Sequence, residues 1–203
     1  KPQVLQLVCE QLAHCSVKSE CLFISIAAGV RESNINRWLG GNRSIVRCMP
    51  NTPALVQLGA TGIFANTLVS SKQKDRAETI LDAVGLSVWV EKEDHLDAVT
   101  AISGSGPAYF FYFIELLQKS AEKLGLPPET AKVLAQQTAL GAASMAQGKD
   151  MAELRAQVTS KNGTTEQAIL SFQENNLASL VDNATQAAHD RSVELASELS
   201  GRS

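Results

Sequence analysis

Apolar and polar positions along the first half of the chain follow two alternating patterns. Residues 2–13 carry apolar side chains at helical spacing, which predicts an amphipathic helix. The run CLFISIAAGV, residues 21–30, is continuously apolar and rich in β-branched residues, which predicts a parallel strand buried on both faces. Later patterns predict helices over residues 31–41 and 70–85, and strands that begin near residues 44, 59 and 86. Strands that alternate with helices in this way favour an α/β layer with a largely parallel sheet.

The second half of the chain, from about Leu96, carries helical patterns only and is rich in alanine and leucine. The helix expected over residues 107–125 is apolar on all sides in its first turns, so we expect other protein to cover it. A last helix is expected over residues 175–199, with one broad apolar face. The sequence therefore predicts an α/β domain over residues 1–94 and an all-helical domain over residues 95–203.

Composition excludes several classes of protein. The chain has 203 residues, 44% of them hydrophobic, with a net charge of −3 and an isoelectric point near 5.7. It contains no basic stripe for nucleic acid, no apolar run of the roughly 20 residues that a membrane span needs, and no signal-peptide pattern. We therefore expect a soluble, cytoplasmic protein that binds neither nucleic acid nor membrane.

The cysteines and histidines indicate neither a metal site nor a catalytic dyad. Cys9, Cys15, Cys21 and Cys48 include no C-x-x-C pair, so we expect buried reduced thiols rather than a zinc site or a disulfide framework. The three histidines adjoin no serine or cysteine in a recognisable pattern. We expect no bound metal.

Two loops at predicted strand ends are candidate binding sites. Ile26, Ala27 and Ala28 end a parallel strand, where small side chains let a flat ring or a phosphate approach the backbone. Packing of a helix against the sheet would explain these small residues equally well. In the next loop, Asn51 and Thr52 offer a polar edge between two prolines, and a simple turn is the alternative.

A third loop, VTSKNGTTEQAI at residues 158–169, gathers hydroxyl groups before a predicted helix. The residues that carry the prediction are Thr159, Ser160, Thr164 and Thr165, which surround Gly163. Hydroxyls and free backbone N–H groups at the positive end of a helix dipole predict an anion site, and a small carboxylate suits it. Thr164 and Gln167 stand at capping-box spacing before the helix. An ordinary helix cap that uses only Thr164 is the alternative, but the surplus of hydroxyls favours binding.

The segment AISGSGPAY, residues 101–109, matches neither of two common catalytic or nucleotide motifs. No glycine stands two positions before Ser103, so the segment is not a nucleophile elbow. Tyr109 stands where a dinucleotide fingerprint has its third glycine, and no G-x-G-x-x-G opens any predicted helix of the chain.

Four long motifs resemble one enzyme family. They are ISIAAGV, VRCMPNTPALVQLGATGIFAN, DAVTAISGSGPAYFF and VTSKNGTTEQAI, in the order found in pyrroline-5-carboxylate reductases, which reduce a cyclic imine in the last step of proline synthesis. The resemblance extends over essentially the whole chain. It implies a Rossmann-like domain that binds NADPH or NADH, followed by a helical domain that forms a homodimer, with dimers assembled into a larger ring.

The resemblance also implies roles for particular residues. Residues implied to hold the substrate carboxylate are Ser160, Gly163, Thr164 and Thr165, and those implied to line the cofactor are Lys1, Pro2, Ile26, Ala27, Ala28 and Asn51. Thr100 would be catalytic and would present its hydroxyl to the ring nitrogen. Because a ring imine can arrive already protonated, positioning and one hydroxyl would suffice without a strong general acid.

The chain begins at Lys1, in what resembles the end of a strand, and the family's G-x-G-x-x-G segment is not in it. We therefore expect a longer protein to supply that segment. Two alternatives stay open: a truncated, inactive helical dimerisation module, or another imine or keto-acid reductase built from the same two domains.

Overall fold

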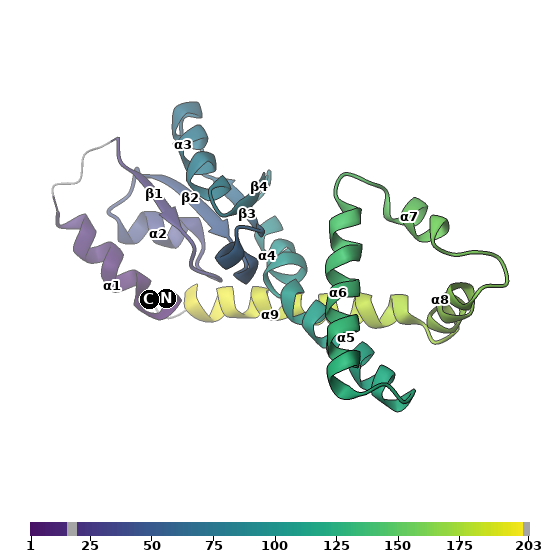
Figure 1. Cartoon of the computed structure of the whole chain (residues 1–203). Helices are drawn as coiled ribbons and strands as arrows, with labels where there is room; N and C mark the ends of the chain where they lie inside the picture. The colour runs from purple at the N-terminus through teal and green to yellow at the C-terminus, as the bar shows by residue number, and fades with distance from the viewer. Residues whose placement is uncertain (16–19, 201–203) are drawn as a thin grey trace. The chain divides into compact units, whose positions relative to one another are not determined.

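The computed structural model describes residues 1–15 and 20–200, apart from the side chains of residues 199 and 200. The backbone divides into two compact units, each described by itself below (Figure 1). The first unit is Lys1–Pro107 with Ala184–Ser203, and the second is Ala108–Asn183. The domain boundary expected between residues 94 and 95 stays a prediction. The two units are separated by compactness, whereas the expected boundary separates an α/β domain from a helical one.

A four-stranded sheet in the order β1-β2-β3-β4 organises the first unit. The strands are β1 (Leu22–Ser25), β2 (Ser44–Met49), β3 (Gly59–Ala65) and β4 (Gly85–Trp89). The β1–β2 and β3–β4 pairs are parallel, because helices α2 (Glu32–Trp38) and α3 (Ser71–Asp82) form the crossovers. The β2–β3 pair is antiparallel, since the segment between them holds only the short helix η1 (Thr52–Val56). The predicted α/β layer is confirmed, as a mixed sheet.

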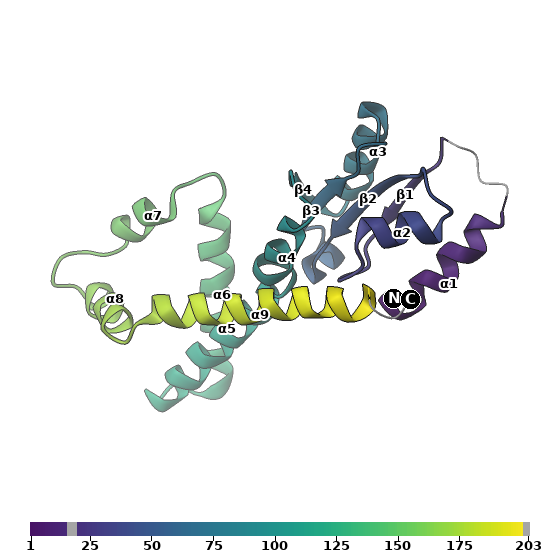
Figure 2. The ribbon, with the colours of Figure 1, turned by 180° about the vertical axis from the view of Figure 1, so that it is seen from behind.

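Helices cover both faces of this sheet. On one face, Cys9 of α1 (Pro2–Ala13) and Ile35 of α2 pack with Ile45 of β2, and α2 lies in front of the strands in the reverse view (Figure 2). On the other face, Leu81 of α3 packs with Val46 of β2. Neighbouring residues of a strand point to opposite faces, so β2 contributes to both cores.

Strand β1 is less buried than its apolar run predicts. All four of its residues are only half-buried, and the strand has a single neighbour, β2, among the described residues. An apolar run is typical of a strand with helices and neighbours on every side, and β1 stands at the edge of this sheet. The expectation of burial on both faces is therefore wrong for β1 in this chain.

The cysteines differ in exposure, and this gives a direct test of the packing. All four are free thiols; Cys9 and Cys48 are buried, whereas Cys15 and Cys21 are exposed, so the expectation of buried thiols is wrong for those two. Burial raises the pKa of the Cys48 thiol to about 12. We expect an alkylating reagent at about pH 8 to modify Cys15 and Cys21 within minutes and Cys48 only on unfolding, as measured by peptide mass spectrometry.

The same pKa shift of Cys48 predicts a pH dependence of stability. The neutral thiol is favoured in the fold, so its contribution is fully present below the ordinary value of 9.0 and is lost as the pH rises towards about 12. Rapid alkylation of Cys48 in folded protein would contradict this packing.

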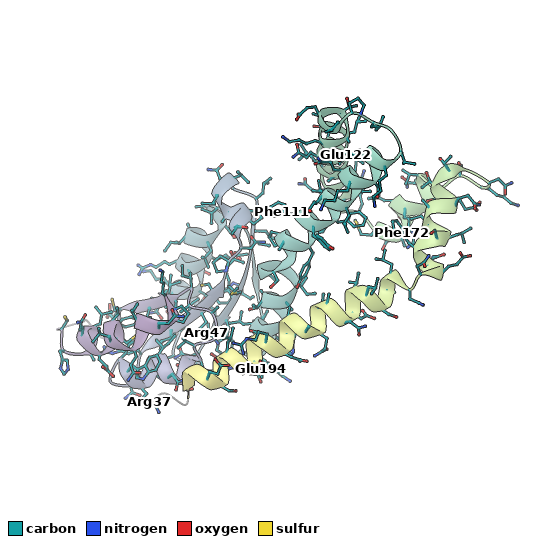
Figure 3. All side chains as sticks on the ribbon, turned by 90° about the horizontal axis from the view of Figure 1, so that it is seen from below. Arg37, Arg47, Phe111, Glu122, Phe172 and Glu194 are labelled. Atoms are coloured by element: carbon teal, nitrogen blue, oxygen red, sulfur yellow. The ribbon has the colours of Figure 1, made fainter. Side chains whose placement is uncertain are left out.

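The described part of the second unit is entirely helical in its regular elements. Its helices are α5 (Gly106–Lys123), α6 (Pro128–Ala146), α7 (Met151–Gln157), α8 (Thr164–Glu174) and the start of α9 (Leu177–Ser200). At the start of α5, Phe110, Phe111 and Tyr112 are 70%, 66% and 62% exposed; Figure 3 labels Phe111. The helices of one chain leave these aromatic rings exposed. The expectation that another protein chain covers them stays a prediction.

Candidate functional site

The loop that follows β1 presents small residues at one edge of the sheet. Ile26 is 65% exposed, Ala27 is half-buried and Ala28 is exposed. The N–H of Ala27 donates to the Ser25 hydroxyl at 3.3 Å, and Gly29 turns the chain at φ 72°, a left-handed value that glycine adopts without strain. The exposed small side chains leave room for a flat ring to approach the backbone.

Asn51 holds the loop that follows β2. Its Oδ1 accepts a hydrogen bond from the N–H of Ala60 at 2.8 Å, and its Nδ2 donates to the carbonyl oxygen of Ser103 at 3.0 Å. These two bonds fasten the loop to β3 and to the segment that carries Thr100. The Asn51 amide is therefore engaged in hydrogen bonds within the protein, whereas the sequence suggested that it is open to a ligand.

Thr100 stands where helix α4 (His95–Val99) widens into the π-helical segment η2 (Thr100–Gly104). The N–H of Ser105 donates to the Thr100 carbonyl at 2.8 Å, which closes the wide turn, and such turns are frequent at functional sites. The Thr100 hydroxyl donates to the carbonyl of Leu96 at 2.7 Å. Since its proton is used there, Oγ1 offers its lone pairs to any group that arrives.

A cavity of about 200 Å³ within the first unit brings Ala28 and Thr100 together. Its lining residues are Ala28, Gly29, Thr100, Ser105, Ala188, Arg191, Ser192 and Leu195. One wall is the loop after β1, another is the Thr100 segment, which is η2 with Ser105, and the third is the end of α9. Two residues chosen from different motifs of the sequence thus share one cavity, and the α9 wall was not foreseen.

An ion pair between buried Arg47 and half-buried Glu93 fixes the start of α2 against β2. Arg47, only 6% exposed and labelled in Figure 3, donates through Nη1 to Oε1 of Glu93 at 2.6 Å. The N–H of Glu32 donates to the same oxygen at 2.5 Å. The sequence shows Glu93 only as part of a charged segment, because Arg47 and Glu32 lie far from it along the chain.

A second set of charges joins α2, α4 and α9. Arg31, directly before α2, donates to Asp94 at 2.7 Å and to Asp97 at 2.9 Å. The hydroxyl of Ser192 donates to the other oxygen of Asp97 at 2.7 Å. Sequence reasoning assigned no role to any of the four residues, although Asp97 opens the motif DAVTAISGSGPAYFF.

The third candidate loop lies in the second unit and is capped differently from the expectation. Gly163 is the N-cap of α8 and Thr164 is its first residue, so the predicted capping box of Thr164 and Gln167 is wrong. Glu166 instead accepts the N–H of Asn162 at 2.7 Å, and Asn162 has φ 60°. No side chain caps α8, so the first N–H groups of the helix have no intrahelical acceptor.

The hydroxyl groups of this loop are available to a ligand. Ser160, Thr164 and Thr165 are exposed, and their hydroxyls have no hydrogen-bond partner among the residues that the structure describes. The expectation is wrong for Thr159, because its hydroxyl already donates to the carbonyl of Arg155 at 2.6 Å. Three hydroxyls beside an uncapped helix start suit a small anion.

Lys1 and Pro2 are the remaining predicted site residues, and they lie at the start of the chain. Lys1 is exposed and precedes α1, which Pro2 opens. Within residues 1–15 and 20–200, no group of three His, Cys, Asp or Glu side chains could hold a metal ion. None of the described helices is both long and apolar enough to cross a bilayer.

Comparisons with known proteins agree over nearly the whole chain. A family model described as pyrroline-5-carboxylate reductase dimerisation matches residues 93–195. The pyrroline-5-carboxylate reductase of Pseudomonas aeruginosa is 52% identical over 201 residues, 98% of this chain and 73% of that protein. The Haemophilus influenzae enzyme of the same name is 42% identical over 198 residues, 96% of this chain and 73% of that protein.

Solved structures give the same answer. A pyrroline-5-carboxylate reductase of Coxiella burnetii has a TM-score of 0.91 at 49% identity, covering 96% of this chain and 73% of that one. A pyrroline carboxylate reductase of Plasmodium falciparum, solved with NADP bound, has a TM-score of 0.84 at 32% identity over 96% of this chain and 78% of that one. The chain therefore belongs to the pyrroline-5-carboxylate reductase family of oxidoreductases, with a Rossmann-like layer and a helical dimerisation domain.

Proposed function

We propose that the protein carrying this chain reduces 1-pyrroline-5-carboxylate to L-proline with NADPH or NADH. The observation that supports this most strongly is the cavity in which Thr100 faces the small residues after β1. It combines a surface for a flat ring with a hydroxyl for the reacting group. The names of the similar proteins supply the substrate, and the NADP in the Plasmodium falciparum structure supports a nicotinamide dinucleotide.

The residues at the sheet edge fit a nicotinamide cofactor, which supplies the hydride when it is bound. The residues assigned to its site are Lys1, Pro2, Ile26, Ala27, Ala28 and Asn51. Ile26 and Ala28 offer exposed apolar surface to the ring, and Asn51 keeps the neighbouring loop in place through its bonds to Ala60 and Ser103. An ordered, apolar surface orients the ring and excludes water from it.

The loop before α8 is assigned to the substrate carboxylate. Its members are Ser160, Gly163, Thr164 and Thr165. The exposed hydroxyls and the uncapped N–H groups donate hydrogen bonds, and a carboxylate accepts them at the positive end of the helix dipole. Anchoring the carboxylate fixes the position of the imine carbon on the same small ring.

Thr100 is assigned to the ring nitrogen. Because its hydroxyl proton is held by the Leu96 carbonyl, Oγ1 accepts a hydrogen bond from a protonated imine. Hydride addition to the imine carbon then turns the iminium into a neutral amine, and the nitrogen keeps its proton. No side chain has to act as a general acid in that step.

Replacing Thr100 by valine in the full-length protein tests this assignment. We expect kcat/KM for pyrroline-5-carboxylate to fall about tenfold or more, because a hydrogen bond to a charged group is lost. The measurement is NADPH oxidation followed by absorbance. Thr79→Val is the matched control, since the Thr79 hydroxyl makes the same kind of bond to the Asp75 carbonyl on α3. A Thr100→Val value within about twofold of wild type would remove the assignment.

The wild-type protein decides between the candidate functions in the same assay. Turnover with pyrroline-5-carboxylate supports the proposal. Turnover with only another cyclic imine or a keto acid would replace it by the related reductase activity. A folded, full-length dimer without turnover on any of these would leave a dimerisation module.

The homodimer, its assembly into a ring and the cytoplasmic location belong to this proposal. The exposed Phe110, Phe111 and Tyr112 support a partner, because uncovered aromatic clusters of this kind are typical of interfaces.

A further inference from the structure

Asp97 is a buried carboxylate whose two oxygens hold two different elements of the first unit. It is 6% exposed and lies on α4, three positions before Thr100. Oδ2 accepts a hydrogen bond from Nη2 of Arg31 at 2.9 Å, and Oδ1 accepts one from the hydroxyl of Ser192 at 2.7 Å. Ser192 is also only 6% exposed, so this bond is shielded from water.

Each member of this trio lies on, or next to, a segment that forms a different wall of the Thr100 cavity, although only Ser192 lines the cavity itself. Arg31 ends the loop after β1, which contributes Ala28 and Gly29 to the cavity. Asp97 shares α4 with the start of the Thr100 segment, and Ser192 is itself a lining residue on α9. The carboxylate of Asp97 therefore links the segments that form the three walls.

The neighbouring acidic residue does not have this arrangement. Asp94 also binds Arg31, at 2.7 Å, but its side chain is 84% exposed and the side chain of Arg31 is 22% exposed. No bond from Asp94 to α9 is present among the described residues. Asp94 and Asp97 thus share one partner and differ in burial and in the link to Ser192, which makes them a matched pair for experiment.

We infer that Asp97 is a positioning residue of the proposed reaction: it clamps Arg31 and Ser192 and so holds Thr100 at a fixed distance from the loop after β1. This inference rests on the proposed function. The Thr100 hydroxyl and the cofactor surface lie on different elements, and hydride transfer requires both to meet the same small ring. Positioning errors of about 1 Å from changes outside the site cost up to about a hundredfold in rate.

The clamp is tested with Ser192→Ala and Asp97→Asn in the full-length enzyme. For Ser192→Ala, which removes a single hydroxyl, we expect kcat to fall about tenfold, with both KM values within about threefold of wild type. For Asp97→Asn we expect a fall in kcat of about thirtyfold, because the carboxylate charge that holds Arg31 is lost. Asp94→Asn is the control and should keep kcat within about twofold.

Rates are to be expressed per active site, counted by titration with NADPH, and each variant's melting temperature is measured beside them. A merely structural role would lower the melting temperature and the number of active sites but leave kcat per site unchanged. That result for Ser192→Ala would overturn the clamp, whatever Asp97→Asn shows. An equal fall in kcat for Asp94→Asn would overturn it too, because the effect would then follow from the charge near Arg31 alone.

The outcomes separate this inference from the proposed function. Wild-type protein without turnover would overturn the proposed reductase activity and, with it, the role of the clamp. Active wild-type protein whose Ser192→Ala variant keeps its kcat would overturn the clamp alone. If Asp97→Asn does not fold, Ser192→Ala decides by itself, since it leaves the Arg31–Asp97 pair in place.

Discussion

Replacing Glu93 by alanine is expected to lower the free energy of unfolding by about 3–5 kcal/mol. The cause is Arg47, whose side chain is only 8% exposed and whose charge would lose its partner at 2.6 Å. The N–H of Glu32 would lose its acceptor at the same time, which loosens the start of α2. Urea unfolding followed by circular dichroism measures the change as a lower midpoint at an unchanged slope.

Two further variants make this result specific to the buried pair. Asp94→Ala removes a neighbouring carboxylate whose side chain is 84% exposed, and it should cost about 1 kcal/mol or less. Arg47→Met combined with Glu93→Leu replaces both charges by apolar groups and should regain much of the loss, because neither charge is then left alone. A loss below about 1.5 kcal/mol for Glu93→Ala would contradict the assignment of a buried, mutually dependent pair.

Replacing Thr164 and Thr165 together by valine is expected to raise the KM for pyrroline-5-carboxylate by about a hundredfold or more. Each hydroxyl donates to a charged carboxylate in the proposed complex, and such a bond contributes about 1.5–3 kcal/mol. Since about 1.4 kcal/mol corresponds to a tenfold change in binding, two bonds account for this factor. The KM for NADPH should stay within about twofold of wild type. Steady-state kinetics with each substrate varied in turn give both values.

A substrate without a carboxylate provides the sharper comparison for this loop. With 1-pyrroline, the double variant and the wild type should have similar KM values, because the bonds in question are absent from both. Ser171→Ala, on an exposed turn further along α8, is the control and should change neither KM. An equal rise in KM for 1-pyrroline and for pyrroline-5-carboxylate would mean that the valines disturb the shape of the loop rather than carboxylate binding.

The elements that sequence predicts best are those whose pattern repeats over neighbouring residues. The helix expected over residues 2–13 is α1 (Pro2–Ala13), and the change to helices near Leu96 coincides with the start of α4. Exposure was predicted less well, because burial depends on neighbours from elsewhere in the chain: β1 is half-buried, and Cys15 and Cys21 are exposed. The cap of α8 was wrong because the helix begins one residue earlier than expected, with Gly163 as its N-cap.

The candidate site also combines features that neighbouring residues determine with contacts between residues far apart in the chain. Small residues after a strand and hydroxyls before a helix are local features, so Ala28 and Thr165 could be singled out from the sequence. The meeting of Ala28 with Thr100 is not a local feature, and only the family resemblance implied it, because it depends on how α4 packs beside the sheet. The contacts of Asp97 are not local either, because its partners Arg31 and Ser192 stand 66 and 95 positions away along the chain.

The sequence by itself therefore determined the order and type of the elements, the family motifs and the chemical character of each loop. These follow from periodicity, turn residues and side-chain chemistry, which act over a few neighbouring residues. Only the tertiary structure decided the antiparallel pairing of β2 with β3, the Arg47–Glu93 pair and the bonds of Asp97 to Arg31 and Ser192. These contacts join residues far apart in the chain, and they form only when packing of the whole sheet layer has compensated the entropy of closing the intervening loops.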